Sequence, residues 1–162
     1  MLRDGVCQVV ISPRPPEAGD LLHKRLFEDR YAVFYDPAQR DAPATMADYV
    51  AADHVTVVYE PRRTLDLDQV LADRGVVRHF VASVPGFAGV PAFLRGTDWI
   101  ATAPSLLRLG AMRGLASAEP PLPCPTMPMY LIWHVRHQAD PMHRWLRQAV
   151  EDAVPEPLRS AP

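Results

Sequence analysis

Residues 54–109 alternate three times between a strand-like run and a helix-like segment, and this alternation constrains the fold more than any other feature. The strand-like runs are rich in β-branched or aromatic residues, whereas the helix-like segments carry apolar residues at helical spacing. A strand that joins a parallel neighbour needs a crossover, which is usually a helix. The pattern therefore predicts an α/β fold with a mainly parallel sheet. The predicted strands are 54–59, 76–84 and 99–103, and the predicted helices are 66–71, 86–94 and 105–109.

Helix ends are marked by capping residues. Thr45 is an N-cap for a short helix over 46–51, and Gly75 is placed to end the helix that Asp66 begins. Asp140 and Pro141 form an N-cap and N1 pair, which opens an amphipathic helix to about residue 153. Its apolar side chains are expected in the core, and they are Met142, Trp145, Leu146 and Val150.

The outer segments do not continue the alternation. We expect them to form a second lobe to which the chain returns, with lobe one built from about 1–28 and 115–154 and lobe two from about 29–114. Further strands are predicted at 6–11, 21–27, 31–35, 115–122 and 130–135, and residues 155–162 are expected to be a flexible tail.

Composition narrows the class of protein. A formal net charge of −2 gives no electrostatic footprint for nucleic acid, so direct DNA contact by this chain is not expected. The 2 cysteines, Cys7 and Cys124, lie far apart, which favours reduced thiols over a disulfide framework. No apolar segment approaches the length needed to cross a bilayer, so we expect no membrane partner and a cytoplasmic location.

Several stretches, in order along nearly the whole chain, resemble one family. Residues 4–11 and 26–31 are similar to consecutive strands of LysR-type transcriptional regulators, although Gln8 departs from the aspartate that the family prefers there. Residues 98–104, DWIATAP, resemble another strand of that family. The most specific match is WHVR at 133–136 followed by DP at 140–141, which is similar to the subgroup of nodulation regulators and aromatic-acid sensors.

The resemblance implies a fold and a function. It implies an effector-binding domain with a type 2 periplasmic-binding-protein-like fold of two lobes, of which lobe one is incomplete here. It also implies a small-molecule effector between the lobes, homo-oligomers, no cofactor, and a winged helix-turn-helix that this sequence lacks.

Candidate ligand-binding residues follow from the same resemblance. They are Arg62, Arg63, Thr64, Gly86, Phe87, Ser12 and Pro13. An arginine at 62 or 63 can clamp a carboxylate with two hydrogen bonds, but Thr64 and Gly86 stand where aromatic-acid sensors often carry histidine. A solvated surface role for the arginine pair and inward packing of Phe87 stay open as alternatives.

Other chemistry is less well supported. His134, His137 and His143 have no standard metal-ligand spacing, and Asp66 and Asp68 at a helix start are better explained by capping and the helix dipole. No nucleophile elbow, phosphate-binding glycine loop or Cys-x-x-Cys motif is present, so no catalytic residue and no metal site are predicted. A small α/β enzyme and a stand-alone solute-binding protein remain the alternative readings.

Overall fold

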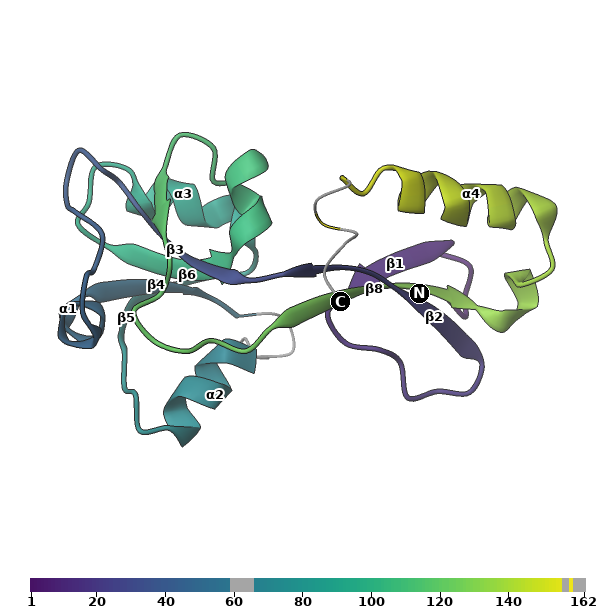
Figure 1. Ribbon diagram of the computed structural model, residues 1–162, viewed down its shortest axis with the longest axis horizontal. Coiled ribbons are helices and arrows are strands. Elements are labelled where there is room, and N and C mark those ends of the chain that lie inside the picture. The colour runs from purple at the N-terminus through teal and green to yellow at the C-terminus, as the bar shows by residue number, and fades with distance from the viewer. Residues whose placement is uncertain (59–65, 156–157, 159–162) are drawn as a thin grey trace. The chain divides into compact units, whose positions relative to one another are not determined.

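The computed structural model describes residues 1–58, 66–155 and 158. The chain divides into two compact units, each with its own sheet (Figure 1). The first unit is Met1–Asp29 with Thr126–Pro162, and the second is Arg30–Pro125. No helix in the described part of the chain is long and apolar enough to cross a membrane.

The first unit holds a three-stranded antiparallel sheet in the order β1-β8-β2. The strands are β1 (Val9–Ser12), β2 (Leu21–Asp29) and β8 (Met127–His134). Val9 and Leu22 both lie opposite Trp133, and side chains alternate between faces along each strand, so these three share one face of the sheet. That face packs with Val150 and Val154 at the C-terminal end of the chain, which forms the apolar core of this unit.

Helix α4 (Pro141–Asp152) begins as the sequence predicts, because the Asp140 side chain accepts hydrogen bonds from the backbone N–H groups of Met142 and His143. Of the four apolar residues predicted for its inner face, Val150 packs on the core of this unit and Leu146 is half-buried, but the prediction is wrong for Met142 and Trp145. Met142 and Trp145 are 71% and 67% exposed, whereas His143 and Arg147 are buried. The helix is preceded by the 3₁₀ turn η3 (Val135–His137).

The second unit is built on a five-stranded sheet in the order β5-β4-β6-β3-β7. Its strands are β3 (Tyr31–Tyr35), β4 (Asp53–Val57), β5 (His79–Val84), β6 (Ile100–Pro104) and β7 (Ala116–Ala118). Strand β4 pairs in parallel with β5 and β6, which confirms the parallel sheet predicted from the alternation, and β3 adds antiparallel pairings to β6 and β7.

The assignment of residues 115–125 to the outer lobe differs from the structure. Strand β7 pairs with β3, with Val33 opposite Ala118, so this stretch belongs to the second unit. Alternating apolar residues predict a strand but not the sheet that it joins, and this choice depends on which edge is available.

Helices cover both faces of the larger sheet, with α2 and α3 on opposite faces (Figure 1). The helical elements are α1 (Met46–Ala51), α2 (Asp66–Asp73), η1 (Phe87–Gly89), α3 (Val90–Leu94) and η2 (Ser105–Leu109). Thr45 caps α1 with a full capping box to Asp48, and Gly75 has φ 74° after α2, as its predicted αL role requires. Pro91 lies in the first turn of α3, where backbone N–H groups have no partner within the helix. The lack of an N–H in proline therefore costs no hydrogen bond, and Pro91 does not break the helix.

The two faces of the larger sheet differ in chemistry. Val55 and Val57 of β4 and Ala101 and Ala103 of β6 belong to an apolar cluster that includes Val90 and Leu94 of α3. Because side chains alternate along a strand, the intervening residues Thr56 and Thr102 point to the opposite face. That face holds a buried polar network.

Candidate effector-binding site

The carboxyl ends of β4 and β5 mark the ligand-binding edge expected of a parallel sheet. Gly86 follows β5 with an extended backbone, φ −174° and ψ 159°, and apart from its chain neighbours no described residue has an atom within 4 Å of where a Cβ would stand. Phe87 begins η1, is half-buried and packs against the apolar cluster. The two residues are adjacent at this edge, and Phe87 has the inward packing weighed for it from sequence.

Of the remaining candidates, only Ser12 and Pro13 are among the described residues, and they belong to the first unit. Arg62, Arg63 and Thr64 are outside the described residues. Ser12 ends β1 in the first unit, where its hydroxyl accepts a hydrogen bond from the backbone N–H of Arg14 at 3.1 Å. Pro13 next to it is exposed. The polar atom of Ser12 therefore closes a turn at the end of this strand.

An ion pair buried in the second unit was missed by the sequence reasoning. The Arg78 Nη2 donates to Asp68 Oδ1 at 2.5 Å, and the side chains are only 4% and 9% exposed, respectively. Thr56 Oγ1 donates to the other oxygen, Asp68 Oδ2, at 3.1 Å. The pair joins α2 to the residue just before β5, and Thr56 connects the same carboxylate to β4. Asp68 is thus a buried partner of an arginine, and the helix-dipole explanation given for it from sequence is incomplete.

Tyr49 extends this network across the sheet. Its hydroxyl bonds to Thr102 Oγ1 at 2.7 Å and accepts a hydrogen bond from Arg78 Nη1 at 3.3 Å. Burial raises the pKa of Tyr49, so the phenol stays protonated and can donate to Thr102. The network therefore links α1, α2, β4 and β6 through side chains alone.

His54 completes the polar face from the start of β4. Its Nε2 donates to the backbone carbonyl of Tyr49 at 2.7 Å, and its buried Nδ1 has no hydrogen-bond partner among the described residues. Burial lowers the pKa of His54 from 6.5 to about 4, and the nearby charge of Arg78 acts in the same direction. The imidazole is therefore neutral at physiological pH.

The position of this network gives it a local role. Asp68 lies in the first turn of α2, directly after the segment that contains the candidate residues 62–64. A charged pair buried on one side of α2 specifies where that helix starts, since any shift would leave a charge without its partner. The sequence does contain the two opposite charges, Asp68 and Arg78. It gives no indication that they pair, because they are ten positions apart and a helix end lies between them.

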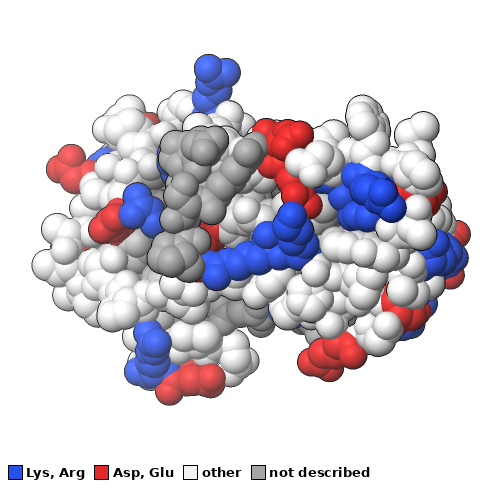
Figure 2. Space-filling view, turned by 45° about the vertical axis from the view of Figure 1, so that its right-hand side comes forward, with Lys and Arg blue, Asp and Glu red and all other residues white. Residues whose placement is uncertain are grey.

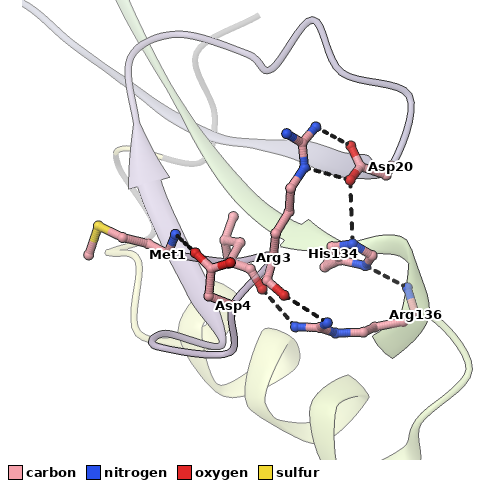
Figure 3. A network of polar contacts seen from close by, with 7 residues as sticks. Met1, Arg3, Asp4, Asp20, His134 and Arg136 are labelled. Carbon is pink, nitrogen blue, oxygen red and sulfur yellow. Dashed lines mark hydrogen bonds and ion pairs between the residues drawn. The ribbon is translucent and has the colours of Figure 1, made fainter.

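The WHVR motif organises the first unit, as Figure 3 shows for His134 and Arg136. His134 Nδ1 accepts from the Arg136 backbone N–H at 3.1 Å, so Nε2 carries the proton and faces Asp20 Oδ2 at 3.4 Å. Asp20 is also held by both ends of the Arg3 guanidinium at 2.7 Å, and these hydrogen bonds lower its pKa to about 2. Arg136 in turn donates to the carbonyls of Leu2 and Arg3. The motif thus ties the N-terminal turn to the end of β8.

Trp133, the first residue of that motif, packs on α4. Trp133 Nε1 donates to Gln138 Oε1 at 2.8 Å, and the Arg147 guanidinium lies 4.7 Å from the indole centroid. Arg147 also donates to His143 Nδ1 at 2.8 Å, which leaves His143 Nε2 to donate to the Gln8 carbonyl at 3.0 Å. Both ring nitrogens of His143 are therefore engaged in structural hydrogen bonds. Among the described residues, no group of three histidine, cysteine or acidic side chains is placed to hold a metal ion.

Surface charges are mixed. On the face seen in Figure 2, basic and acidic side chains are interspersed without a large area of one sign. This distribution agrees with the small net charge of −2, and such a surface offers no extended basic stripe on that face for a phosphate backbone.

Comparison with known proteins shows what this pair of units is. The LysR substrate binding domain family matches residues 1–155. The regulatory domain of MexT, a transcriptional activator in Pseudomonas aeruginosa, superposes with a TM-score of 0.77 at 27% identity, covering 94% of this chain and 76% of that one. Nodulation protein D 1 of Sinorhizobium fredii is 28% identical over 153 residues, 91% of this chain and 48% of that protein. The HTH-type transcriptional activator NagR of a Ralstonia species is 27% identical over 151 residues, 91% of this chain and 50% of its own.

The fold is therefore that of the type 2 periplasmic-binding-protein-like domains found in transcriptional regulators. Within that class, the chain belongs to the LysR substrate-binding domain family. It spans about half the length of the curated relatives that it matches.

Proposed function

We propose that this chain is the effector-sensing part of a LysR-type transcriptional regulator and has no catalytic role. The main support for the proposal is that residues 1–155 match the LysR substrate binding domain family. The name of that family denotes substrate binding. Transcriptional activators among the relatives support a regulatory output and hence a cytoplasmic location. Effector binding would act by favouring one of two arrangements of the regulator, as in any ligand-biased equilibrium.

The proposed contacts to the effector are Arg62, Arg63, Thr64, Gly86, Phe87, Ser12 and Pro13. The location of Gly86 and Phe87 after β5, at the carboxyl edge of the parallel strands, supports the proposal for these two residues. As far as the described residues go, the space beside Gly86 leaves room for a ligand group near the backbone. A carboxylate is the effector chemistry that an arginine at 62 or 63 binds best.

Isothermal titration calorimetry with benzoate and salicylate tests the carboxylate proposal. Arg62→Met and Arg63→Met are each expected to weaken binding by about 10-fold or more, because a charge-assisted hydrogen bond is lost. The control Arg113→Met, an exposed arginine of the second unit, is expected to leave the affinity unchanged. If neither acid binds the unaltered protein at millimolar concentration, a small aromatic carboxylate is the wrong effector class. Equal affinities in all three variants would remove residues 62 and 63 from the site.

A catalytic alternative is less well supported. Ser105, the first residue of η2, is buried, its backbone N–H donates to the Arg30 carbonyl, and its hydroxyl accepts from Arg108. These contacts are those of a residue that closes a turn. An acyl-transfer activity that disappears in Ser105→Ala but not in Ser83→Ala would favour the enzyme reading.

A further inference from the structure

Two imidazole rings are stacked where the chain enters α4. The ring centroids of His137 and His143 are 4.8 Å apart, and the ring planes are within 7° of parallel. His143 is 4% exposed and His137 is half-buried. His137 ends η3 and His143 lies in the first turn of α4, so the stack joins the two sides of the short loop between these elements.

Each ring accepts a hydrogen bond from an arginine. Arg136 Nε donates to His137 Nε2 at 3.1 Å, and Arg147 Nη1 donates to His143 Nδ1 at 2.8 Å. An imidazole nitrogen accepts a hydrogen bond only when it carries no proton, so both rings are neutral in this arrangement. His143 also donates from Nε2 to the Gln8 carbonyl at 3.0 Å. A further proton on either ring would therefore replace an acceptor by a donor that faces an arginine.

Arg147 is held in place by contacts other than His143. It is 8% exposed, its guanidinium lies over the Trp133 ring, and it donates to the carbonyls of His137 and Gln138 at 3.2 Å. The guanidinium cannot turn toward solvent without losing these contacts. Protonation of His143 would therefore place two positive charges side by side where little water is present to screen them.

The other charged groups around the stack do little to offset such a charge. Burial lowers the pKa of His137, and the neighbouring His143, Arg136 and His134 act in the same direction. Asp140 acts in the opposite direction, but its carboxylate already caps α4 by accepting from two backbone N–H groups.

The acidic group nearest to β8 has partners of its own. Asp20 accepts two hydrogen bonds from Arg3 and lies 3.4 Å from His134 Nε2, as Figure 3 shows. On α4 itself, the residue after His143 is Arg144, an exposed further cation. The surroundings of the stack therefore favour two neutral rings over a charged one.

We propose that His143, stacked on His137, is a proton-sensitive contact that holds the start of α4 on the first unit at neutral pH and releases it in mild acid. With the ring neutral, His143 ties the helix to Gln8, the residue before β1, and accepts from Arg147. A histidine that is kept neutral by folding binds a proton more readily once it is released into water. Acidification below about pH 6.5 therefore favours the released helix, and a return to neutral pH restores the contact. The proposal rests on this cluster and not on the proposed effector.

Hydrogen–deuterium exchange of the full chain at about pH 7.5 and about pH 5, corrected for the intrinsic effect of pH on amide exchange, tests the proposal. Protection of the amides of residues 141–152 should fall by about 10-fold or more at the lower pH, because a charge-assisted hydrogen bond is lost. His143→Gln removes the titrating ring, while its amide can still accept from Arg147 and donate to the Gln8 carbonyl. In this variant α4 should keep its protection at the lower pH. His23→Gln, which replaces an exposed histidine of β2, is the matched control and should behave as the unaltered chain does.

Two further readouts separate this contact from a general effect of acid. Peptides of the second unit should respond to pH equally in the unaltered chain and in His143→Gln, because the substitution lies in the first unit. Nitrogen-15 spectra of the unaltered chain should show His143 with its proton on Nε2 at about pH 7.5 and with both nitrogens protonated at about pH 5. An α4 that keeps its protection in acid, or that loses it equally in His143→Gln, would overturn the proposal. A His143 ring that stays neutral while α4 loses protection would do the same, without the use of any variant.

Discussion

Replacing Arg78 by methionine should be among the most destabilising single changes in the second unit. The substitution keeps an unbranched apolar stem but removes the guanidinium, which leaves the carboxylate of Asp68, 9% exposed, without its cation. Removing one partner of a buried ion pair costs about 3–5 kcal/mol. Arg78 also donates to the Tyr49 hydroxyl and stacks over Phe80 at 4.9 Å, so the upper part of that range is expected.

Urea unfolding followed by far-UV circular dichroism measures this cost. The midpoint should fall while the slope m stays constant, because the exposed area changes little. The double variant Asp68→Asn with Arg78→Met should recover at least half of the loss, since no charge is then buried. Glu119→Gln is the matched control, because its ion pair with Arg30 is exposed and should be worth less than about 0.5 kcal/mol. A loss below about 1 kcal/mol for Arg78→Met would refute the reasoning.

Three further changes have outcomes set by local geometry. Burial lowers the pKa of His54 from 6.5 to about 4, so folding holds the imidazole neutral. Its contribution to the free energy of unfolding should therefore fall by about 3 kcal/mol as the pH drops from 6.5 to 4. Urea unfolding of His54→Gln at several pH values should show a free energy of unfolding that changes less with pH than that of the unaltered chain. Thr45→Ala removes the hydroxyl that accepts from the Asp48 N–H and should lower the free energy of unfolding by about 1 kcal/mol; an unchanged midpoint would show that the cap contributes nothing. Gly75→Ala places a Cβ at φ 74° and should cost about 1 kcal/mol by the same assay, although space around the position is open.

The placement of the secondary structure could be read from sequence where local chemistry decides it. Tyr31–Tyr35 and the helix Met46–Ala51 have the predicted bounds, and α4 begins at Pro141 because Asp140 caps its first turn. The last predicted helix of the alternation, Ser105–Leu109, is a 3₁₀ helix. Such agreement is expected because caps and turns act over a few residues.

Interpretation failed where the partner of a residue lies far along the chain. Trp145 looked like a core residue by helical spacing, yet His143 and Arg147 take the inner positions because the Gln8 carbonyl and the Trp133 ring receive them. An arginine can be buried when carbonyl oxygens accept its hydrogen bonds and an aromatic face contacts its guanidinium. No local sequence pattern predicts such surroundings.

The sequence by itself determined the class of fold, the order of the elements and the family, since these follow from periodicity, capping residues and motif order. Only the tertiary structure decided which sheet β7 joins, which side of α4 is buried, and that Asp68 and Arg78 neutralise each other inside the second unit. The physical reason is that periodicity and capping are properties of neighbouring residues. The burial of a charge or an aromatic ring depends instead on groups that the folded chain brings together from distant positions.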